Sequence, residues 1–102
     1  MQAIIDIGST SVRLCFCDQR KAVNEKQVET TRLAENQTEG GELWRPALIR
    51  TAEAVEKFVL AARSFGFEPE IFATEAVRSA SNRDEFLKAV FEKTGKKITV
   101  VE

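Results

Sequence analysis

Histidine is absent from the 102 residues, and the chain has only two cysteines and one tryptophan. Without histidine the chain lacks the commonest general base of enzymes, so any catalysis depends on carboxylates, a metal ion or electrostatic stabilisation. The same shortage leaves no set of ligands for a zinc site. Cys15 and Cys17 stand two residues apart in an apolar run. We expect them on one face of a strand, reduced and half-buried, because an ordinary disulfide cannot join residues at that spacing.

The chain also lacks an excess of charge of either sign, since 15 Lys and Arg face 16 Asp and Glu. No broad basic field would attract nucleic acid or an anionic membrane, so neither is an expected partner and any phosphate site must be local. No apolar stretch approaches membrane-spanning length, and a strand pattern begins at the N-terminus without a signal peptide. We therefore expect a cytoplasmic protein with one small domain, residues 1–102, whose 43% apolar content can form a core.

A polar cluster, residues 6–11, separates two apolar runs near the N-terminus. This arrangement predicts a β-hairpin with strands over residues 2–7 and 11–18 and the polar residues at its tip. Gly8 permits a backbone conformation that a Cβ would forbid, and the tip offers hydroxyl and N–H donors to an anion. The donors belong to Gly8, Ser9, Thr10 and Ser11. A plain tight turn is the alternative, because Gly, Ser, Thr and Asp are ordinary turn residues.

Two charged residues favour a phosphate loop over a plain turn. Asp6 lies at the end of the first strand, where it would face the same anion or a metal ion bound to it. Arg13 follows Ser11 by two residues and therefore shares its face of the second strand, so a hydroxyl and a guanidinium could contact one ligand.

The next segment predicts a third strand and a long helix. After a polar turn at residues 18–21, residues 22–33 alternate in part and predict an edge strand. A polar loop follows and ends in Gly40 and Gly41. Apolar residues at helical spacing then predict a helix over residues 42–65, with Pro46 in its first turns and Gly66 as its stop. We expect Trp44 in the core rather than as a ligand platform, because it lies on the apolar stripe of this helix.

The C-terminal part predicts two strands and a helix. Residues 70–74 form the fourth strand, and residues 75–80 a short helical turn at its carboxyl end. A helix capped by Ser81 or Asn82 continues through Glu92, with Gly95 as its stop. Residues 97–101 form the fifth strand. Because a helix separates the fourth strand from the first three, we expect it to pair parallel to the first strand.

The order βββαβαβ resembles the ribonuclease-H-like half-domain of actin-like ATPases. In that arrangement three antiparallel strands carry a β-hairpin phosphate loop, and two further strands join the sheet in parallel. The resemblance implies an α/β fold with a five-stranded mixed sheet and helices packed on it.

Three segments also resemble the exopolyphosphatase and guanosine pentaphosphate phosphatase (Ppx/GppA) family. Residues 3–14 are similar to its first phosphate loop, D-x-G-S-N-S with Arg or Lys two residues on. Residues 73–82 are similar to its A-T-x-A-x-R-x-A-x-N segment, and residues 42–65 to its connecting helix. The chain thus resembles the N-terminal portion of the family's first actin-like domain.

The resemblance implies cleavage of phosphoanhydride bonds of polyphosphate or guanosine penta- or tetraphosphate, with a divalent metal such as Mg²⁺. By position, Gly8 to Ser11 would cradle a phosphate, Arg13 would bind the phosphate being cleaved, and Asp6 would face the metal. The cleft would be lined or braced by Thr74, Arg78 and Asn82. A structural role for Arg78, paired with a nearby carboxylate, is the alternative.

The chain departs from the family pattern at several points. Thr10 stands where the family usually has Asn, which removes an amide donor and acceptor pair. The S-G-x-x-E-A segment with the family's general base is expected to begin near Glu102, and the second phosphate loop, D-x-G-G-G-S, is absent from these residues. We therefore expect a fragment that is inactive alone and that associates as a homodimer through uncovered apolar surface.

Two other interpretations stay open from the sequence. A dehydratase activator or sugar kinase fragment of the same superfamily can carry the loop D-x-G-S-T-S, although such loops generally have Lys or Thr at the position of Arg13. Alternatively, the chain is a stand-alone phosphate-binding or nucleotide-binding module, or one that pairs with another subunit.

Overall fold

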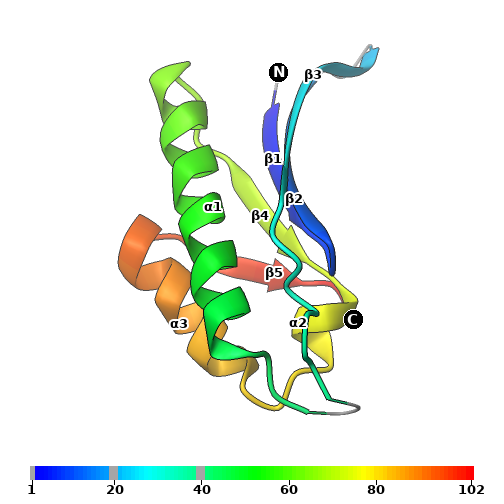
Figure 1. The fold of residues 1–102 in the computed structure, drawn as a ribbon. Helices are drawn as coiled ribbons and strands as arrows, with labels where there is room; N and C mark the ends of the chain where they lie inside the picture. Colours follow the sequence, from blue (N-terminus) through cyan, green and yellow to red (C-terminus); the bar gives the residue numbers. More distant parts are fainter. Residues whose placement is uncertain (1, 19–20, 39–40) are drawn as a thin grey trace.

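Five strands form one mixed sheet in the order β3-β2-β1-β4-β5. The computed structural model describes residues 2–18, 21–38 and 41–102 (Figure 1). In chain order the elements are β1 (Gln2–Ile7), β2 (Ser11–Asp18), β3 (Lys21–Thr30), α1 (Arg45–Ser64), β4 (Glu70–Ala73), α2 (Glu75–Arg78), α3 (Arg83–Thr94) and β5 (Ile98–Val100). The predicted fold class and element order are confirmed, with α2 as the expected helical turn.

Strand β1 lies at the centre of the sheet and fixes the register of its neighbours. It pairs antiparallel with β2, so that Ile5 lies opposite Leu14, and parallel with β4, so that Ile5 lies beside Ile71. All three side chains are buried, because residues opposite one another across a ladder point to the same face. The parallel pairing predicted for the fourth strand is therefore confirmed.

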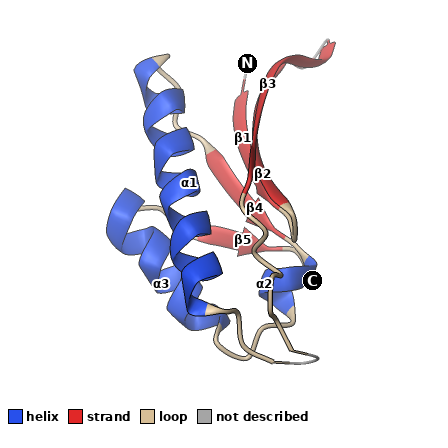
Figure 2. Cartoon of the chain, viewed as in Figure 1, coloured by secondary structure: helices blue, strands red, loops and turns tan. Residues whose placement is uncertain are grey.

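Helices α1 and α3 pack against each other and cover one face of the sheet (Figures 1 and 2). The core lies between them and the strands. Its fully buried side chains include Ile5, Ile7, Val12, Leu14, Ile71, Val55, Val59, Phe86 and Val90. The other face carries the alternate residues Asp6, Arg13 and Cys15, and no helix of the described part of the chain covers it. Cys15 and Cys17 lie on this face and are half-buried, as predicted.

The helix ends follow the glycine and proline signals. Pro46 lies in the first turn of α1, where the missing N–H has no intrahelical partner to lose. Gly66 and Gly95 have φ values of 87° and 73°, so each ends its helix in the left-handed conformation that glycine adopts most readily. Helix α1 begins at Arg45, three residues after the predicted start. In the described part of the chain, no helix combines the length and the apolar character needed to cross a membrane.

Strand β3 ends at Thr30 rather than at the predicted residue 33. The reason is local, because the next two N–H groups, of Thr31 and Arg32, both donate to the carbonyl of Thr10 instead of continuing the ladder. Two predicted loop features, the tip of the polar turn at residues 19–20 and Gly40, lie outside the described residues.

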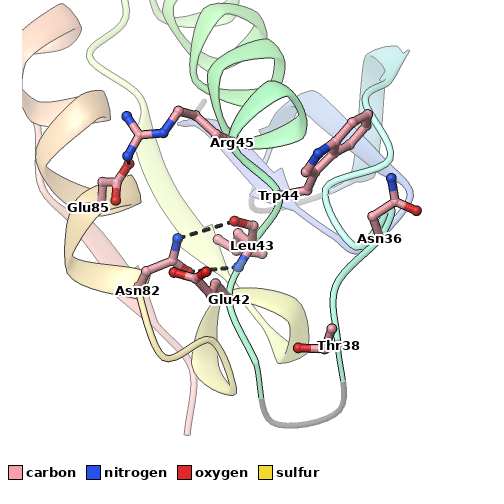
Figure 3. A pocket seen from close by; sticks show the side chains of 8 residues that line it. All are labelled: Asn36, Thr38, Glu42, Leu43, Trp44, Arg45, Asn82 and Glu85. Atoms are coloured by element: carbon pink, nitrogen blue, oxygen red, sulfur yellow. Dashed lines mark hydrogen bonds and ion pairs between the residues drawn. The ribbon is translucent and has the colours of Figure 1, made fainter.

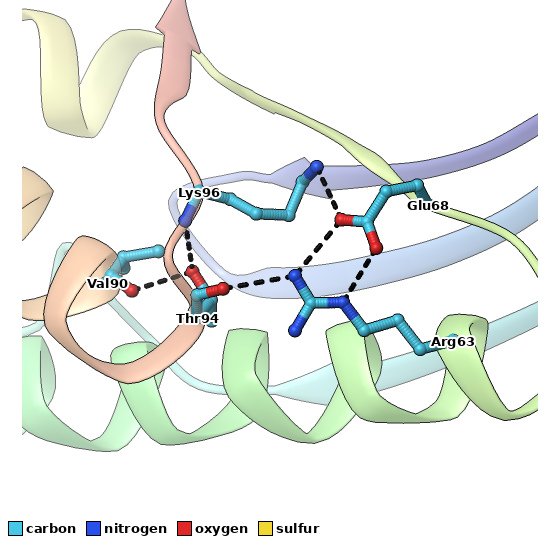
Figure 4. A network of polar contacts seen from close by, with 5 residues as sticks. All are labelled: Arg63, Glu68, Val90, Thr94 and Lys96. Atoms are coloured by element: carbon cyan, nitrogen blue, oxygen red, sulfur yellow. Dashed lines mark hydrogen bonds and ion pairs between the residues drawn. The ribbon is translucent and has the colours of Figure 1, made fainter.

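A polar network closes the end of the molecule where α1 leads into β4 (Figure 4). The carboxylate of Glu68 accepts hydrogen bonds from Arg63 (Nε, 2.8 Å; Nη2, 3.0 Å) and from Lys96 (Nζ, 2.8 Å). Arg63 also donates to the carbonyl of Thr94 at 3.1 Å. The hydrogen bonds from Arg63 and then from Lys96 lower the pKa of Glu68 to about 2. The network thus joins the ends of α1 and α3 to the start of β4.

Candidate phosphate site

The tip of the β1–β2 hairpin is a tight loop closed by one backbone hydrogen bond, from Gly8 N–H to the carbonyl of Ser11 at 2.9 Å. Gly8 does not have a positive φ, so the expectation that it adopts a conformation forbidden to other residues is wrong. Glycine is favoured there by space instead. A Cβ at Gly8 would lie 3.3 Å from the carbonyl oxygen of Ser11, which is closer than ordinary van der Waals contact.

The carbonyl groups of the loop are held by the chain that follows β3. The carbonyl of Thr10 accepts hydrogen bonds from Thr31 N–H at 3.0 Å and Arg32 N–H at 2.8 Å, and the carbonyl of Ser9 accepts one from Ala34 N–H at 3.0 Å. The N–H and hydroxyl groups of Ser9 and Thr10, by contrast, donate to no group in the described part of the chain, and both residues are exposed. The loop therefore presents donors without acceptors, which is the arrangement that binds anions.

Asp6 and Arg13 lie directly opposite each other on β1 and β2. Both are exposed on the face of the sheet that α1 and α3 leave uncovered, and Ser11 lies on the same face. In the described part of the chain neither charged side chain makes a hydrogen bond or ion pair with another residue, so both are available to a ligand. The predicted shared face of Ser11 and Arg13 agrees with this register.

Thr74 lies beside this loop. Ile7 and Ala73 are neighbours across the parallel β1–β4 pair, so Gly8 and Thr74 both follow the carboxyl ends of adjacent strands. Adjacent strands are about 4.8 Å apart, which places these two residues within reach of one small ligand. Ligands of open α/β sheets commonly bind at this edge.

Arg78 and Asn82 lie farther along the chain and make structural contacts. Arg78, the last residue of α2, donates from Nη1 to the carbonyl of Val101 at 2.9 Å. Asn82 accepts from Leu43 N–H through Oδ1 at 2.7 Å and donates from Nδ2 to the Leu43 carbonyl at 3.2 Å (Figure 3). Asn82 occupies the N-cap position of α3, as predicted, but its side chain caps no helical N–H because Leu43 occupies it.

A cavity of about 350 Å³ lies where the starts of α1 and α3 meet (Figure 3). It is lined by Asn36, Thr38, Glu42, Leu43, Trp44, Arg45, Asn82 and Glu85. Trp44 was expected in the core, but 41% of its surface is exposed. The prediction was wrong because α1 begins at Arg45, the residue after Trp44. Trp44 is therefore the N-cap residue and not part of the buried stripe. Arg45 and Glu85 form an ion pair of 3.0 Å across this cavity.

A profile of the Ppx/GppA phosphatase family matches residues 17–102. The chain belongs to this family. A bifunctional 3-dehydroquinate synthase/phosphatase of Fusobacterium nucleatum is 31% identical in an alignment of 113 positions, gaps included, that covers 99% of this chain and 17% of that protein. Exopolyphosphatase 1 of Mycobacterium leprae is 29% identical over 96% of this chain and 30% of its own length. The chain thus spans less than a third of each of these relatives.

Solved structures of the family have the same fold. The PPX-GPPA enzyme of Aquifex aeolicus matches with a TM-score of 0.83 and 31% identity, covering 97% of this chain and 34% of that one. An exopolyphosphatase from Cytophaga hutchinsonii matches with a TM-score of 0.86 at 18% identity, covering 97% and 33%, which shows the fold alone. The activator of 2-hydroxyisocaproyl-CoA dehydratase from Clostridium difficile matches with a TM-score of 0.55 and 10% identity, covering 100% of this chain and 54% of that one. It therefore shares only the actin-like fold.

Two further basic residues of this Ppx/GppA chain lie close to the loop and were not found from the sequence. Arg32 donates its N–H to Thr10, and Arg50 of α1 donates from Nε to the Thr31 carbonyl at 2.7 Å. Arg32 follows a strand at the same edge as the loop, a signal that could have been used. Arg50 gave no signal, because its position on a helix does not indicate which loop it reaches.

Proposed function

We propose that residues 1–102 are the phosphate-binding part of a phosphatase that hydrolyses phosphoanhydride bonds of polyphosphate or of guanosine penta- or tetraphosphate. The observation that carries this proposal is the polarity of the hairpin tip. The carbonyls of Ser9 and Thr10 accept hydrogen bonds from residues 31–34, while both residues are exposed and their N–H and hydroxyl groups donate to no group in the described part of the chain. A terminal phosphate would accept hydrogen bonds from Ser9, Thr10 and Ser11. The relatives named as exopolyphosphatases support polyphosphate as the first substrate to test.

Arg13 is the residue that we assign to the phosphate being cleaved. Phosphoanhydride cleavage depends mostly on positioning and on neutralising negative charge that develops on oxygen atoms. A guanidinium can donate two parallel hydrogen bonds to a phosphate. Arg13 is exposed on the same face as Ser11, so its charge and the loop donors can act on one phosphate group.

Asp6 would be the protein ligand of a divalent metal such as Mg²⁺. In the part of the chain that the structure describes, no three of the side chains Asp, Glu, Cys and His gather into a metal site. Mg²⁺ commonly binds one or two carboxylates and takes its other ligands from phosphates and water, so a single Asp beside a phosphate loop fits that ion. The metal would neutralise phosphate charge, while Asp6 would hold it near Ser11 and Arg13.

The roles of Thr74 and the two distal residues are proposed separately. Thr74 would contact a ligand at the edge between β1 and β4, since it follows the strand adjacent to the loop. Arg78 and Asn82 would brace the site through the backbone of Val101 and Leu43. In keeping with its balanced charge, we propose a cytoplasmic location for the protein.

An amide-shift titration tests this function. Uniformly ¹⁵N-labelled chain is titrated with inorganic phosphate and then with tripolyphosphate. The amides of Gly8, Ser9, Thr10 and Ser11 should shift, more strongly with tripolyphosphate, and Arg13→Ala should reduce the response. Arg45→Ala is the matched control, because it removes an equal charge from an exposed residue away from the loop. Amides of the loop that stay still while other basic surfaces respond would show that the tip is only a turn.

A stand-alone phosphate-binding or nucleotide-binding module is the second candidate. It is supported by the exposed donors of Ser9 and Thr10, which can bind an anion without cleaving it. The coding frame beyond Glu102 separates the two. A continuation that contains both motifs supports the phosphatase, and a stop codon supports the module.

A further inference from the structure

Arg50 of α1 connects the helix to the segment that holds the phosphate loop. Its Nε donates to the carbonyl of Thr31 at 2.7 Å, and its Nη2 lies 3.4 Å from the carbonyl of Arg32. The same Nη2 donates to Oε1 of Glu35 at 2.8 Å, which orients the guanidinium. Arg50 thus contacts three residues of one short turn, 31–35, from a helix that is itself fixed in the core.

Residues 31–34 of this turn are also hydrogen-bonded to the hairpin tip. Thr31 and Arg32 donate their N–H groups to the Thr10 carbonyl, and Ala34 donates its N–H to the Ser9 carbonyl. At Thr31 and Arg32 the N–H binds the loop while the carbonyl of the same residue accepts from Arg50. A displacement of the turn would therefore move both carbonyls of the phosphate loop and change the direction of its N–H groups.

Contacts from outside the turn must stabilise it, because the backbone conformation of Arg32 is unfavourable by itself. Arg32 has a φ value of 51°, a left-handed conformation that residues with a Cβ, other than Asn and Asp, rarely adopt. Such residues persist where surrounding contacts over-determine them. Around Arg32 those contacts are the hydrogen bond to Thr10 on one side and the guanidinium of Arg50 on the other.

We propose that Arg50, oriented by Glu35, is a positioning residue for the phosphate loop. It touches no ligand itself and acts through residues 31–34 on the carbonyls of Ser9 and Thr10, so that the N–H groups of the tip stay directed at a phosphate. A charge on α1 thus determines the anion affinity of the β1–β2 hairpin. The proposal rests on the proposed phosphate-binding function for its consequence in affinity, but the hold on the loop is independent of it.

The planar arrangement of N–H donors in the Arg50 guanidinium, and not its positive charge alone, holds the turn in place. A guanidinium donates from Nε and Nη2 in one plane, toward two carbonyls and a carboxylate at once. An ammonium is a point charge and cannot reproduce that set. Arg50→Lys should therefore behave more like Arg50→Ala than like the wild type.

The test measures amide hydrogen exchange and phosphate binding in the wild type and in Arg50→Ala, Arg50→Lys, Glu35→Ala and the control Arg45→Ala. The control removes an arginine of the same helix whose partner is Glu85 and not the turn. In Arg50→Ala we expect the exchange protection of the Thr31, Arg32 and Ala34 amides to fall about tenfold, and the apparent dissociation constant for tripolyphosphate to rise about tenfold, as for one lost charged hydrogen bond. Glu35→Ala should change both in the same direction by less, and Arg45→Ala should change neither.

The outcomes separate this inference from the proposed function. Equal protection and equal affinity in the wild type and Arg50→Ala would overturn it, as would lost protection with unchanged affinity. If the wild type gives no phosphate response at Gly8 to Ser11, the proposed function fails, and the exchange data alone decide whether Arg50 holds the turn. If Arg50→Ala does not fold, as judged by exchange at the core amides of Val55 and Ile71, the comparison of Arg50→Lys and Glu35→Ala with the wild type decides.

Discussion

Among the described residues, the buried hydroxyls of Thr31 and Thr51 have no hydrogen-bond partner. Thr31 is 1% exposed and Thr51 0%. An unpaired buried hydroxyl costs about 1–3 kcal/mol relative to one that is bonded or exposed to water. Both residues adjoin the Arg50 contact, one at the start of the turn and one next to Arg50 on α1, so the polar groups around this contact are not all satisfied.

Replacing Thr51 by Val should stabilise the chain by about 1 kcal/mol, because Val has nearly the same shape and lacks the unpaired hydroxyl. Thr94→Val is the matched control. The hydroxyl of Thr94 donates to the Val90 carbonyl at 2.8 Å and accepts from Lys96 N–H at 3.1 Å, so its loss should destabilise the chain by about 1–2 kcal/mol. Urea denaturation measures both. Destabilisation by Thr51→Val would show that an ordered water molecule satisfies the hydroxyl.

Glu68 should make stability depend on pH in acid. Its pKa is about 2 in the folded chain, against an ordinary value of 4.5, because Arg63 and Lys96 donate hydrogen bonds to it. A folded pKa that lies below the unfolded one stabilises the fold above the unfolded value. This contribution is therefore complete above about pH 4.5 and is lost as the pH falls toward 2.

The measurement compares Glu68→Gln with the wild type by thermal unfolding at low salt. The variant should melt at a lower temperature than the wild type at pH 7, and the gap should close between about pH 4.5 and pH 2. Glu70→Gln is the control, because Glu70 makes no ion pair with the described residues. A gap that is constant across this range would mean that the carboxylate charge of Glu68 does not contribute.

The site was only partly predictable at the scale of single residues. Arg13 and Ser11 were predicted to lie on one face of β2 because side chains alternate along a strand, which is a local property. The register of β2 with β3 agrees with this prediction. The contacts of Asn82 with Leu43 and of Arg50 with Thr31 join residues 39 and 19 positions apart. No local pattern encodes such pairs, because they depend on how α1 and α3 lie on the sheet.

At the scale of elements, strands and helices were predicted well where a periodic pattern or a glycine fixes them. Gly66 and Gly95 ended their helices as predicted, since the left-handed conformation strongly favours glycine. The start of α1 and the end of β3 each lie three residues from the predicted position. Both boundaries are set by hydrogen bonds from other parts of the chain, Asn82 to Leu43 and Thr31 and Arg32 to Thr10, and those bonds leave no mark in the local sequence.

Gly95→Ala should destabilise the chain by about 1 kcal/mol, the usual cost of a Cβ in the left-handed region. The cost is purely conformational, because a Cβ at Gly95 would meet no atom within 4 Å and the φ of 73° stays left-handed. Gly95→Asn should cost less, since Asn tolerates this conformation better than Ala does. Thermal or urea denaturation compares them. Equal stability of Gly95→Ala and the wild type would show that the α3–β5 connection relaxes to another conformation.

At the scale of the whole molecule, residues 1–102 place the loop that we propose to bind phosphate at one edge of a sheet. We expect this 102-residue chain to release no phosphate from polyphosphate or guanosine pentaphosphate above background. Neither the S-G-x-x-E-A segment with the family's general base nor the second phosphate loop is among these residues, so water would be neither activated nor aligned. A phosphate-release assay checks this. Release that Arg13→Ala abolishes would contradict it, whereas release that is unaffected by that substitution is background.

The outer edge of the sheet bears on how the chain behaves in solution. Strand β5 pairs only with β4, so its other edge has no partner strand in the described sheet. Beside it lies a groove of about 350 Å³, lined by Leu87, Lys88, Phe91, Lys97 and Ile98. Phe91 is 47% exposed. An unpaired edge next to exposed apolar side chains commonly associates with a second copy of the same surface.

We expect the chain to form a symmetric dimer through this edge at high concentration, with Phe91 at its centre. Phe91→Lys should shift the equilibrium to monomer, because it removes apolar area and places two like charges opposite each other across the symmetry axis. Leu60→Lys is the control, since Leu60 is 59% exposed on α1 and away from β5. Sedimentation velocity over a range of concentrations distinguishes the outcomes. A monomeric wild type would rule out self-association, and loss of the dimer in Leu60→Lys but not in Phe91→Lys would move the interface to α1.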